Sequence, residues 1–290
     1  MVYEFTVKHD YDGKRLRNFL RDKCMLSSSL IRSIKYTDDG LLVDGIKAKT
    51  DKIVHEGQTV TITVPTKANV LSSSDIKVPV VYESKTAMVF DKPAGLATHP
   101  SLNDPDDTLA NVYAALMRAR GEEDAFRPLN RLDKNTSGLL LAAKDRYAAP
   151  LVAKSSSKQY YAVCEGIVEY DRGTIEAPIA RESESIIKRA VHTDGAPSTT
   201  NYEVVQRLDN HTLLKISPLT GRTHQIRVHM AHIGHPLAGD TLYGGSAELI
   251  DRHALHCAFL TFTEPQSGSI VTLESAMPDD MKKLIVKMQN

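Results

Sequence analysis

The chain has 290 residues, 41% of them hydrophobic, and it carries 36 basic and 36 acidic side chains. This length allows one good-sized domain and a smaller one, with cores that need no disulfide or metal. The three cysteines are far apart and form no Cys-x-x-Cys pair, which argues against a disulfide framework and against a zinc site. The formal net charge is zero and does not by itself indicate a nucleic-acid binder, so the local distribution of charge matters more.

The N-terminus gives no sign of a targeting segment. Its first ten residues alternate between apolar and polar, as in a strand, and no basic stretch precedes an apolar one. No apolar run approaches the roughly 20 residues that span a bilayer. We therefore expect a cytoplasmic protein in a reducing compartment, with no membrane partner.

Residues 13–35 contain an excess of positive charge that the net charge hides. Apolar Leu16, Phe19 and Leu20 recur at helical spacing, and a second helix is expected after Ser27. An ordinary solvated helix face is one interpretation of the charges, and a nucleic-acid surface is the other. The basic residues are Lys14, Arg15, Arg17, Arg21, Lys23, Arg32 and Lys35.

Two strands and a linker are expected next. Residues 40–47 predict a strand with a tight turn at Asp44-Gly45, and residues 55–64 end in an alternating strand. Residues 65–75 lack periodicity and gather small polar side chains, as linkers do. We therefore predict a small module at 1–65, a linker at 66–80 and a larger domain at 81–290.

Short strands alternate with helical stretches in the larger domain. The expected strands are 87–90, 160–164, 202–205, 212–216 and 269–273, and the expected helices lie near 109–117, 147–154, 222–233 and 279–288. Scattered strands with few regular crossover helices predict an α+β fold, with a mixed, mainly antiparallel central sheet and helices packed on it.

Asp133 stands between a polar loop and an apolar run. Leu139 to Ala143 predict a strand covered on both faces, so the carboxylate lies at the mouth of the core on a loop held by a rigid strand. Such an Asp can close a turn by bonding its own backbone. It can also be a catalytic acid or base. The local sequence alone leaves both interpretations open.

Four ordered blocks between Val81 and the C-terminus resemble a known family. They are Met88-Val-Phe-Asp-Lys-Pro-Ala-Gly-Leu-Ala-Thr-His-Pro100, Asn130-Arg-Leu-Asp-Lys-Asn-Thr-Ser-Gly-Leu-Leu-Leu-Ala-Ala-Lys144, Lys158-Gln-Tyr-Tyr-Ala-Val-Cys-Glu-Gly166 and Thr220-Gly-Arg-Thr-His-Gln-Ile-Arg-Val-His229. Together they resemble pseudouridine synthases of the ribosomal-large-subunit (RluA-like) type. One departure is Asn130, where the family most often has His; an amide can hydrogen-bond but cannot titrate near neutrality.

The N-terminal residues resemble a second family. The segments Arg15–Leu20, Ser29–Arg32 and Leu42–Lys49 are similar to the small RNA-binding module first recognised in a small-subunit ribosomal protein. This resemblance favours the nucleic-acid interpretation of the basic residues in 13–35.

The first resemblance implies an RNA uridine isomerase that needs no cofactor, nucleotide or metal. It implies that Asp133 carries the chemistry, as nucleophile or as base, and that Arg227 is its ion-pairing partner; without it, Arg227 would be an outward-facing charge. Tyr160 would lie against the uracil and move a proton, and its rival Tyr161 would point to the opposite face of the strand. Ile226 would pack on the other side of the base, or simply in the core.

The resemblance also implies substrate contacts around a flipped base. Arg131 would insert into the stack or contact a phosphate, and its alternative is a surface salt bridge. Arg222 and Lys92 would contact phosphates. Asn130 completes the predicted substrate-binding set.

The expected partner is RNA, namely large-subunit ribosomal RNA or a pre-ribosomal particle rather than transfer RNA. The expected oligomeric state is a monomer. A transfer-RNA isomerase of the same family is one alternative, and a non-catalytic RNA-binding or ribosome-assembly protein is another. A metal-dependent hydrolase is a further rival, because His224, His229, His232 and His235 lie close in sequence. Their spacing lacks a His-x-x-x-His pair, and Gly234 and Pro236 interrupt the helix, which argues against it.

Overall fold

A four-stranded sheet organises the N-terminal part of the chain, in the order β1-β6-β3-β4. The computed structural model describes residues 1–65, 71–101, 104–122, 125–183, 185 and 187–289. Asp44 and Gly45 take the positive φ angles, 51° and 78°, of the tight turn that the sequence predicted between β3 and β4. The strands are β1 (Val2–Thr6), β3 (Leu41–Val43), β4 (Ile46–Lys47) and β6 (Thr59–Thr63), with a separate pair of β2 (Lys14–Arg15) and β5 (Ile53–Val54).

The helices of this part pack their apolar sides on that sheet. After a 3-10 turn, η1 (His9–Tyr11), the predicted first helix is divided into α1 (Leu16–Asn18) and a π-helical turn, η2 (Phe19–Lys23). Leu16, Phe19 and Leu20 are nevertheless fully buried, as their spacing predicted. α2 (Ser28–Lys35) begins where the Ser27 hydroxyl accepts a hydrogen bond from the Leu30 N–H at 3.2 Å.

A ten-stranded sheet forms the larger part. Eight strands follow the order β12-β15-β16-β11-β17-β10-β8-β7, with β18 paired to β17 and β9 to β10. Only β10 with β17 is parallel among the pairings described, which confirms the predicted mixed, mainly antiparallel sheet. The strands are β7 (Val80–Glu83), β8 (Ala87–Lys92), β9 (Arg127–Pro128), β10 (Ser137–Ala143), β11 (Ser157–Glu165), β12 (Arg172–Glu176), β15 (Thr199–Leu208), β16 (His211–Pro218), β17 (Leu255–Thr263) and β18 (Ile270–Glu274).

Strand β17 joins the two halves of this sheet. It is not among the strands expected from the sequence. One half contains β7, β8 and β10, and the other contains β11, β16 and β15. Gly138 of β10 lies opposite both Lys92 of β8 and Cys257 of β17. Its φ is 105°, and a Cβ there would lie 2.2 Å from the Cys257 carbonyl oxygen, so only glycine fits.

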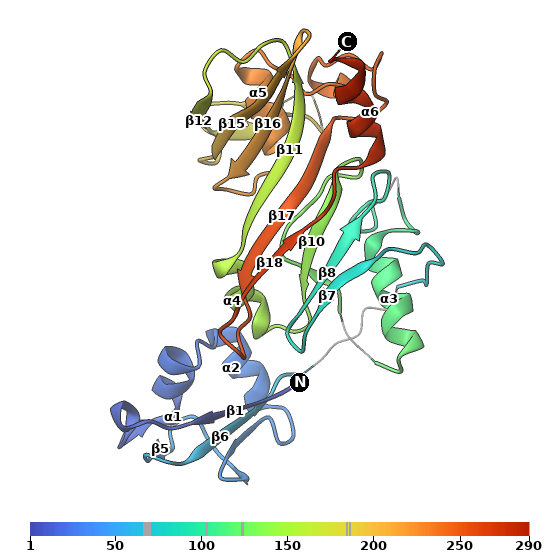
Figure 1. Cartoon of the computed structure of the whole chain (residues 1–290). Coiled ribbons are helices and arrows are strands. Elements are labelled where there is room, and N and C mark those ends of the chain that lie inside the picture. The colour runs from blue at the N-terminus through green and yellow to red at the C-terminus, as the bar shows by residue number, and fades with distance from the viewer. Residues whose placement is uncertain (66–70, 102–103, 123–124, 184, 186, 290) are drawn as a thin grey trace.

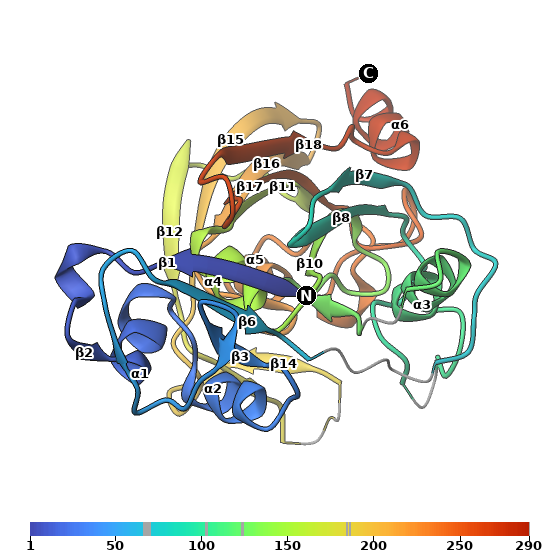
Figure 2. The same ribbon diagram turned by 90° about the horizontal axis from the view of Figure 1, so that it is seen from below.

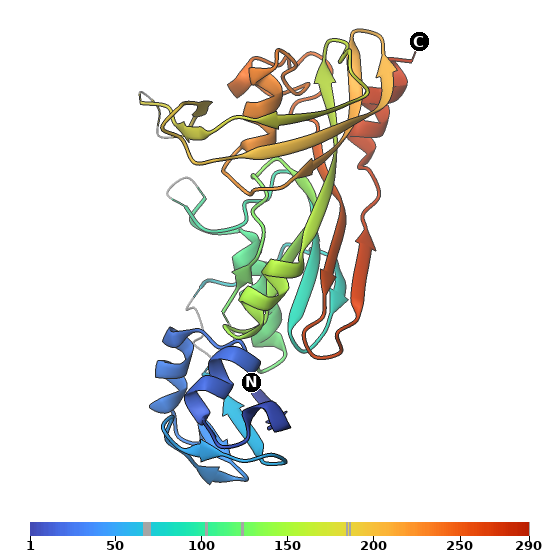
Figure 3. The same ribbon diagram turned by 90° about the vertical axis from the view of Figure 1, so that its left-hand side faces the viewer.

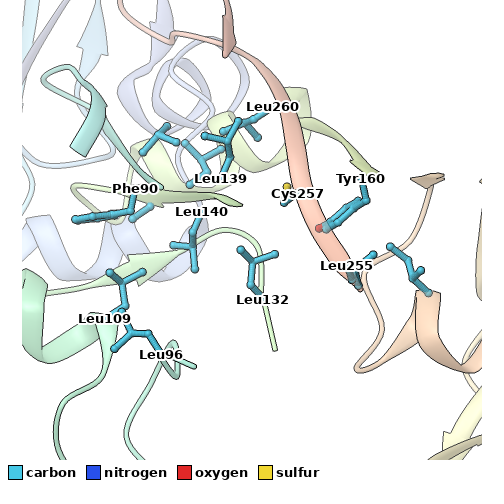
Figure 4. Close-up of a cluster of buried hydrophobic side chains, with 14 of the residues drawn as sticks. Phe90, Leu96, Leu109, Leu132, Leu139, Leu140, Tyr160, Leu255, Cys257 and Leu260 are labelled. Atoms are coloured by element: carbon cyan, nitrogen blue, oxygen red, sulfur yellow. The ribbon is translucent and has the colours of Figure 1, made fainter. Parts of the chain in front are cut away.

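Helices cover the sheet and its ends (Figure 1). Figure 3 shows α4 and α5 on one side of the sheet. The main core lies between the sheet and α3 and includes Phe90, Leu109 and Leu139, all fully buried (Figure 4). The helices are α3 (Leu109–Ala119), α4 (Ala148–Ser155), α5 (Gln225–His232), the short η3 (Thr241–Tyr243) and α6 (Asp279–Lys287), and a small hairpin joins β13 (Ile179–Arg181) to β14 (Arg189–Val191).

The N-terminal part contacts the larger part through the start of α4. The Tyr3 hydroxyl donates a hydrogen bond to Asp145, and the Tyr3 and Tyr147 rings meet edge to face with centroids 4.6 Å apart. Asp145 also accepts hydrogen bonds from the Tyr147 and Ala148 N–H groups at 2.8 Å, which caps α4. Figure 2, which looks from the N-terminal end, shows β1 crossing in front of α4.

The predicted linker is only partly described. Its residues 66–70 lie outside the described part, and residues 71–79 form neither helix nor strand. The Ser74 hydroxyl is 5% exposed and donates to Asp107 at 2.7 Å. This stretch is therefore packed against the larger part, while the predicted domain boundaries stay a prediction.

Candidate active site

The loop that carries Asp133 is anchored to β10 on one side and to the preceding chain on the other. The Asn130 side-chain oxygen accepts a hydrogen bond from the Leu141 N–H at 2.7 Å, and its nitrogen donates to the Leu139 carbonyl at 3.2 Å. The Thr98 hydroxyl donates to the Leu132 carbonyl at 2.9 Å. These bonds use buried polar groups to hold the loop, so the position of Asp133 is set by the sheet.

Arg227 of α5 bridges Asp133 and a second carboxylate. Its Nη1 donates to Asp133 Oδ2 at 2.9 Å, while Nε and Nη2 each donate to the Asp240 carboxylate at 2.7 Å. The Arg227 side chain is 8% exposed and that of Asp240 1%. The bidentate pair with Asp240 and the single charge-assisted hydrogen bond to Asp133 together stabilise the buried guanidinium.

The electrostatics of the site favour an ionised Asp133. Burial alone would raise the pKa of Asp133, but His224, Arg227 and His253 together hold it below its usual value. The carboxylate is thus charged at neutral pH, as a nucleophile or base must be. In the described structure its side chain binds Arg227 rather than the backbone of its own turn, so the turn-closing interpretation does not describe it.

A cavity of about 540 Å³ opens beside Asp133. Its volume lies within the range of small-ligand sites and would accept a nucleoside. Of the predicted site residues, the lining contains Asp133, Tyr160, Arg227, Ile226, Arg131, Arg222 and Asn130. Lys154 at the end of α4 and Lys158 of β11 also line the cavity. Lys158 opens the third family block, but neither lysine was predicted as a site residue.

Tyr160 presents its ring to the cavity from β11. It is 6% exposed, and Figure 4 shows it beside Leu255 and Cys257 of β17. Burial and then the neighbouring Cys257 and Asp133 raise the pKa of Tyr160 well above its usual value, so its hydroxyl is neutral. Tyr161 lies away from the cavity, with its ring centroid 5.7 Å from that of Phe259. The alternation of the strand thus separates the two tyrosines as predicted.

Lys92 contradicts its predicted role as a phosphate contact. It is 1% exposed, and its Nζ donates to the carbonyls of Pro93, Leu96 and Lys134 at 2.8 to 3.1 Å. Burial lowers the pKa of Lys92 to about 7, and the charge of Asp133 opposes that shift. Lys92 therefore holds the loop around Asp133 from inside the protein.

Of the other predicted substrate-binding residues, two lie at the rim of the cavity and two in its wall. Arg131 and Arg222 are exposed at the edge of the cavity, and Arg222 Nε donates to the Pro197 carbonyl at 3.4 Å. Ile226 is 6% exposed and belongs both to the core and to the cavity wall. Asn130 also lines the cavity, but both ends of its amide bind the backbone of β10. This placement contradicts a primary role in substrate binding.

The clustered histidines serve several structural contacts. His229 is fully buried between the Thr200 hydroxyl and the Ala177 carbonyl, each at 2.9 Å, and His235 binds the Glu165 carbonyl at 2.9 Å. Within the described ranges, no group of three His, Cys, Asp or Glu side chains could hold a metal. Among the helices of the same ranges, none has the length and apolar character to cross a membrane.

The predicted basic residues of the N-terminal part all lie at the surface. Lys14, Arg15, Arg17, Arg21, Lys23, Arg32 and Lys35 are exposed. Lys14 and Lys35 lie over the rings of Tyr11 and Tyr36, at 5.0 and 5.8 Å from the ring centroids. No ion pair joins any of the seven to another described residue.

Comparison with known proteins places the chain among isomerases that rearrange a nucleoside within RNA. Residues 86–232 match the family described as RNA pseudouridylate synthase. The chain is 36% identical to the uncharacterized RNA pseudouridine synthase YlyB of Bacillus subtilis, over 99% of this chain and 98% of the relative. It therefore belongs to the RNA pseudouridylate synthase family, which confirms the family suggested by the sequence motifs.

Two further relatives agree with this assignment. Ribosomal large subunit pseudouridine synthase D of Pseudomonas aeruginosa is 36% identical, over 86% of this chain and 83% of the relative. The solved structure of human RNA pseudouridylate synthase domain containing 1 superposes with a TM-score of 0.55 at 28% identity, over 69% of this chain and 83% of the human one.

Asp240 was missed as a site residue. It ends a segment of Gly, His, Pro and apolar residues to which the sequence motifs gave no role. Asp240 could have been predicted from its position shortly after the helix that carries Arg227. A buried arginine is better compensated by two carboxylates than by one, so a second acidic residue near Arg227 was to be expected.

Proposed function

We propose that this protein converts specific uridines of large-subunit ribosomal RNA to pseudouridine, with Asp133 as the catalytic carboxylate. The observation that carries the proposal is the contact of Arg227 with Asp133 Oδ2 at 2.9 Å, at the wall of a nucleoside-sized cavity. Among the described residues, no hydrogen bond reaches Oδ1 of Asp133, so this oxygen is free to meet a substrate. Relatives named ribosomal large subunit pseudouridine synthase D support the RNA class.

The reaction requires a uridine outside its helical stack. A flipped base would enter the cavity with its sugar beside Asp133, and unstacking costs a few kcal/mol. Arg131, exposed at the rim, would fill the gap in the stack or bind the next phosphate. Arg222, Lys154 and Lys158 supply further positive charge for the RNA backbone around the opening.

The chemistry begins at the glycosidic bond. Ionised Asp133 either attacks the sugar at C1′ or removes a proton from the sugar, and both routes release the uracil through N1. The uracil turns within the cavity and a bond forms between C1′ and C5, as the Asp133–C1′ bond breaks on the first route or the sugar regains its proton from Asp133 on the second. The proton at C5 leaves and N1 gains one, so atoms and charge balance. The neutral Tyr160 hydroxyl would relay the C5 proton by giving up its own as it receives one.

The N-terminal part is proposed to be an RNA-binding module. Its seven exposed basic residues would meet phosphates, which adds a second grip on a large structured RNA. This second grip favours ribosomal RNA or a pre-ribosomal particle over transfer RNA. The monomeric state and the cytoplasmic location stay predictions.

The test is site-resolved mapping of pseudouridine. Unmodified large-subunit ribosomal RNA and a transfer RNA pool are incubated with the wild-type protein or with Asp133→Asn, without added cofactor. We expect new pseudouridine in the ribosomal RNA with the wild type alone, because Asn keeps the size of Asp but cannot act as nucleophile or base. Modification of transfer RNA alone would favour the other substrate class. Tight RNA binding by both proteins without any new pseudouridine would favour a non-catalytic binder.

A further inference from the structure

His224 lies directly before α5 in an unfavourable backbone conformation. Its φ and ψ are 57° and 18°, in the left-handed region that side chains other than glycine rarely adopt. Non-glycine residues held there cost of order 1 kcal/mol or more and gather at functional sites. His224 lines the cavity, and its Nε2 lies 3.7 Å from Asp133 Oδ2.

Tyr243 of η3 fixes the other side of the imidazole. The Tyr243 hydroxyl oxygen lies 2.8 Å from His224 Nδ1 and accepts a hydrogen bond from the Arg189 N–H at 3.0 Å. Because Arg189 donates to this oxygen, the hydrogen of the hydroxyl is left to be donated to Nδ1. A neutral imidazole that accepts at Nδ1 carries its own hydrogen on Nε2, toward Asp133.

The charge state fits this arrangement. Burial lowers the pKa of His224, and the charge of Asp133 opposes that shift without reversing it, so the ring is neutral near pH 7. Burial likewise raises the pKa of Tyr243, which keeps its hydroxyl hydrogen. The charged and titratable groups that face His224 are Asp133, Arg189, Arg227, Asp240 and Tyr243.

His224 and Arg227 approach the same oxygen of the catalytic carboxylate. Arg227 donates to Oδ2 at 2.9 Å, and His224 Nε2 faces that oxygen from 3.7 Å. The guanidinium of Arg227 also lies over the Tyr243 ring, with its central carbon 5.0 Å from the centroid. Tyr243 thus supports both groups that face Oδ2, whereas no hydrogen bond from a described residue reaches Oδ1.

We propose that His224 is a positioning residue, which directs its Nε2–H at Oδ2 of Asp133 and so keeps Oδ1 turned to the sugar of the bound uridine. This inference rests on the proposed function, because it needs Asp133 to act on a nucleoside. The distance of 3.7 Å is longer than a hydrogen bond. Such contacts in free enzymes shorten when the substrate closes the site.

The experiment compares two substitutions that differ in one donor. His224→Gln keeps an N–H group at the position of Nε2, whereas His224→Leu keeps the bulk without a donor. His232→Gln is the matched control, because His232 lies in the last turn of the same helix and is exposed. Single-turnover conversion of large-subunit ribosomal RNA by a saturating excess of enzyme gives the rate constant of the bound complex, and filter binding gives the RNA affinity separately.

We expect His224→Leu to lower the single-turnover rate constant by about ten- to a hundredfold, the range for loss of a hydrogen bond to a charged group. RNA affinity should stay within about twofold, since the missing hydrogen bond serves orientation rather than binding. His224→Gln should recover most of the rate. Equal rates for His224→Leu and His232→Gln would overturn the proposal, and so would equal losses for His224→Leu and His224→Gln.

A spectroscopic measurement is independent of turnover. Nitrogen-15 chemical shifts of the wild-type imidazoles, with His224 assigned by its loss in His224→Gln, report which ring nitrogen is protonated at pH 7. The Nε2–H tautomer is expected, and an Nδ1–H tautomer or a charged ring would overturn the inference. Because this measurement uses the wild-type protein, it tests the inference even if His224→Leu fails to fold. If the wild type modifies no RNA while His224 has the Nε2–H tautomer, the proposed function fails and the geometry of the His224 ring stands.

Discussion

Arginine side chains are used in opposite ways at the two ends of this molecule. In the N-terminal part, Arg17, Arg21 and Arg32 are exposed and make no ion pair with a described residue. At the cavity, Arg227 is 8% exposed and bound to two carboxylates. The first group can therefore exchange water and counterions for phosphates, whereas Arg227 is committed to holding Asp133 in place.

Removal of Arg227 should have the largest effect, because it disrupts the buried bridge. Arg227→Met leaves Asp240 buried without its partner, so we expect the free energy of unfolding to fall by about 3 to 5 kcal/mol, together with loss of activity. Urea unfolding measures the change. Arg222→Met, an exposed arginine of the same segment, should change stability by less than about 0.5 kcal/mol. Similar losses for both variants would show that the two-carboxylate bridge does not stabilise the fold.

Neutralising the exposed arginines should act on binding alone. With Arg17, Arg21 and Arg32 changed to Gln, the slope of log affinity against log salt should become shallower by up to about 0.9 for each phosphate that is no longer bound. Each phosphate interaction should be worth about 1 kcal/mol near physiological salt. The single-turnover rate with a saturating excess of enzyme should persist.

The control for that experiment lies at the far end of the molecule. Lys282, Lys283 and Lys287 are exposed on the last helix, α6, which is remote from the N-terminal part in Figure 1. Their change to Gln removes the same charge. An equal shift of the salt slope in both triple variants would mean that the N-terminal part is no special RNA surface.

Acid should lower the stability of the folded protein through His253. Burial lowers the pKa of His253 to about 4, from 6.5 in the unfolded chain. Below pH 6.5 the unfolded chain therefore binds a proton that the folded one does not, so stability is complete above pH 6.5 and is lost as pH falls toward 4. The decrease in stability between pH 7 and 5 is about 2 kcal/mol.

His253→Gln should remove that part of the pH dependence. Unfolding free energies at pH 7 and pH 5 measure it, and the exposed His192→Gln serves as control. A decrease between these pH values as large in His253→Gln as in the wild type would show that His253 is protonated in the folded protein.

Sequence motifs were sufficient to predict which residues meet at the cavity. The resemblance grouped Asp133, Tyr160 and Arg227, and the structure brings these three to one cavity. Periodicity placed α6 and most antiparallel strands within a few residues, because their apolar spacing matches one buried face. The catalytic roles of the three residues stay predictions until activity is measured.

The burial of individual polar side chains could not be predicted from the sequence. Lys92 was expected at a phosphate, yet three backbone carbonyls bind it inside the protein. Asn130 was expected at the substrate, yet it fastens the loop to β10. Both depend on tertiary contacts with chain segments that converge only after folding. Strand β17 was not predicted: its first four residues are buried without alternation, and only Phe259 to Thr263 alternate between half-buried and buried side chains.

The fit at Gly138 makes the catalytic alignment sensitive to a single methyl group. Asp133 belongs to the half of the sheet with β10, while Tyr160 and Arg227 belong to the other half, and the two halves meet where Gly138 faces Cys257. An added Cβ there would force the strands apart and shift Asp133 relative to its partners. Misplacement by about 1 Å can cost a hundredfold in rate. Activity could thus be lost with every catalytic side chain intact, through a residue that never touches RNA.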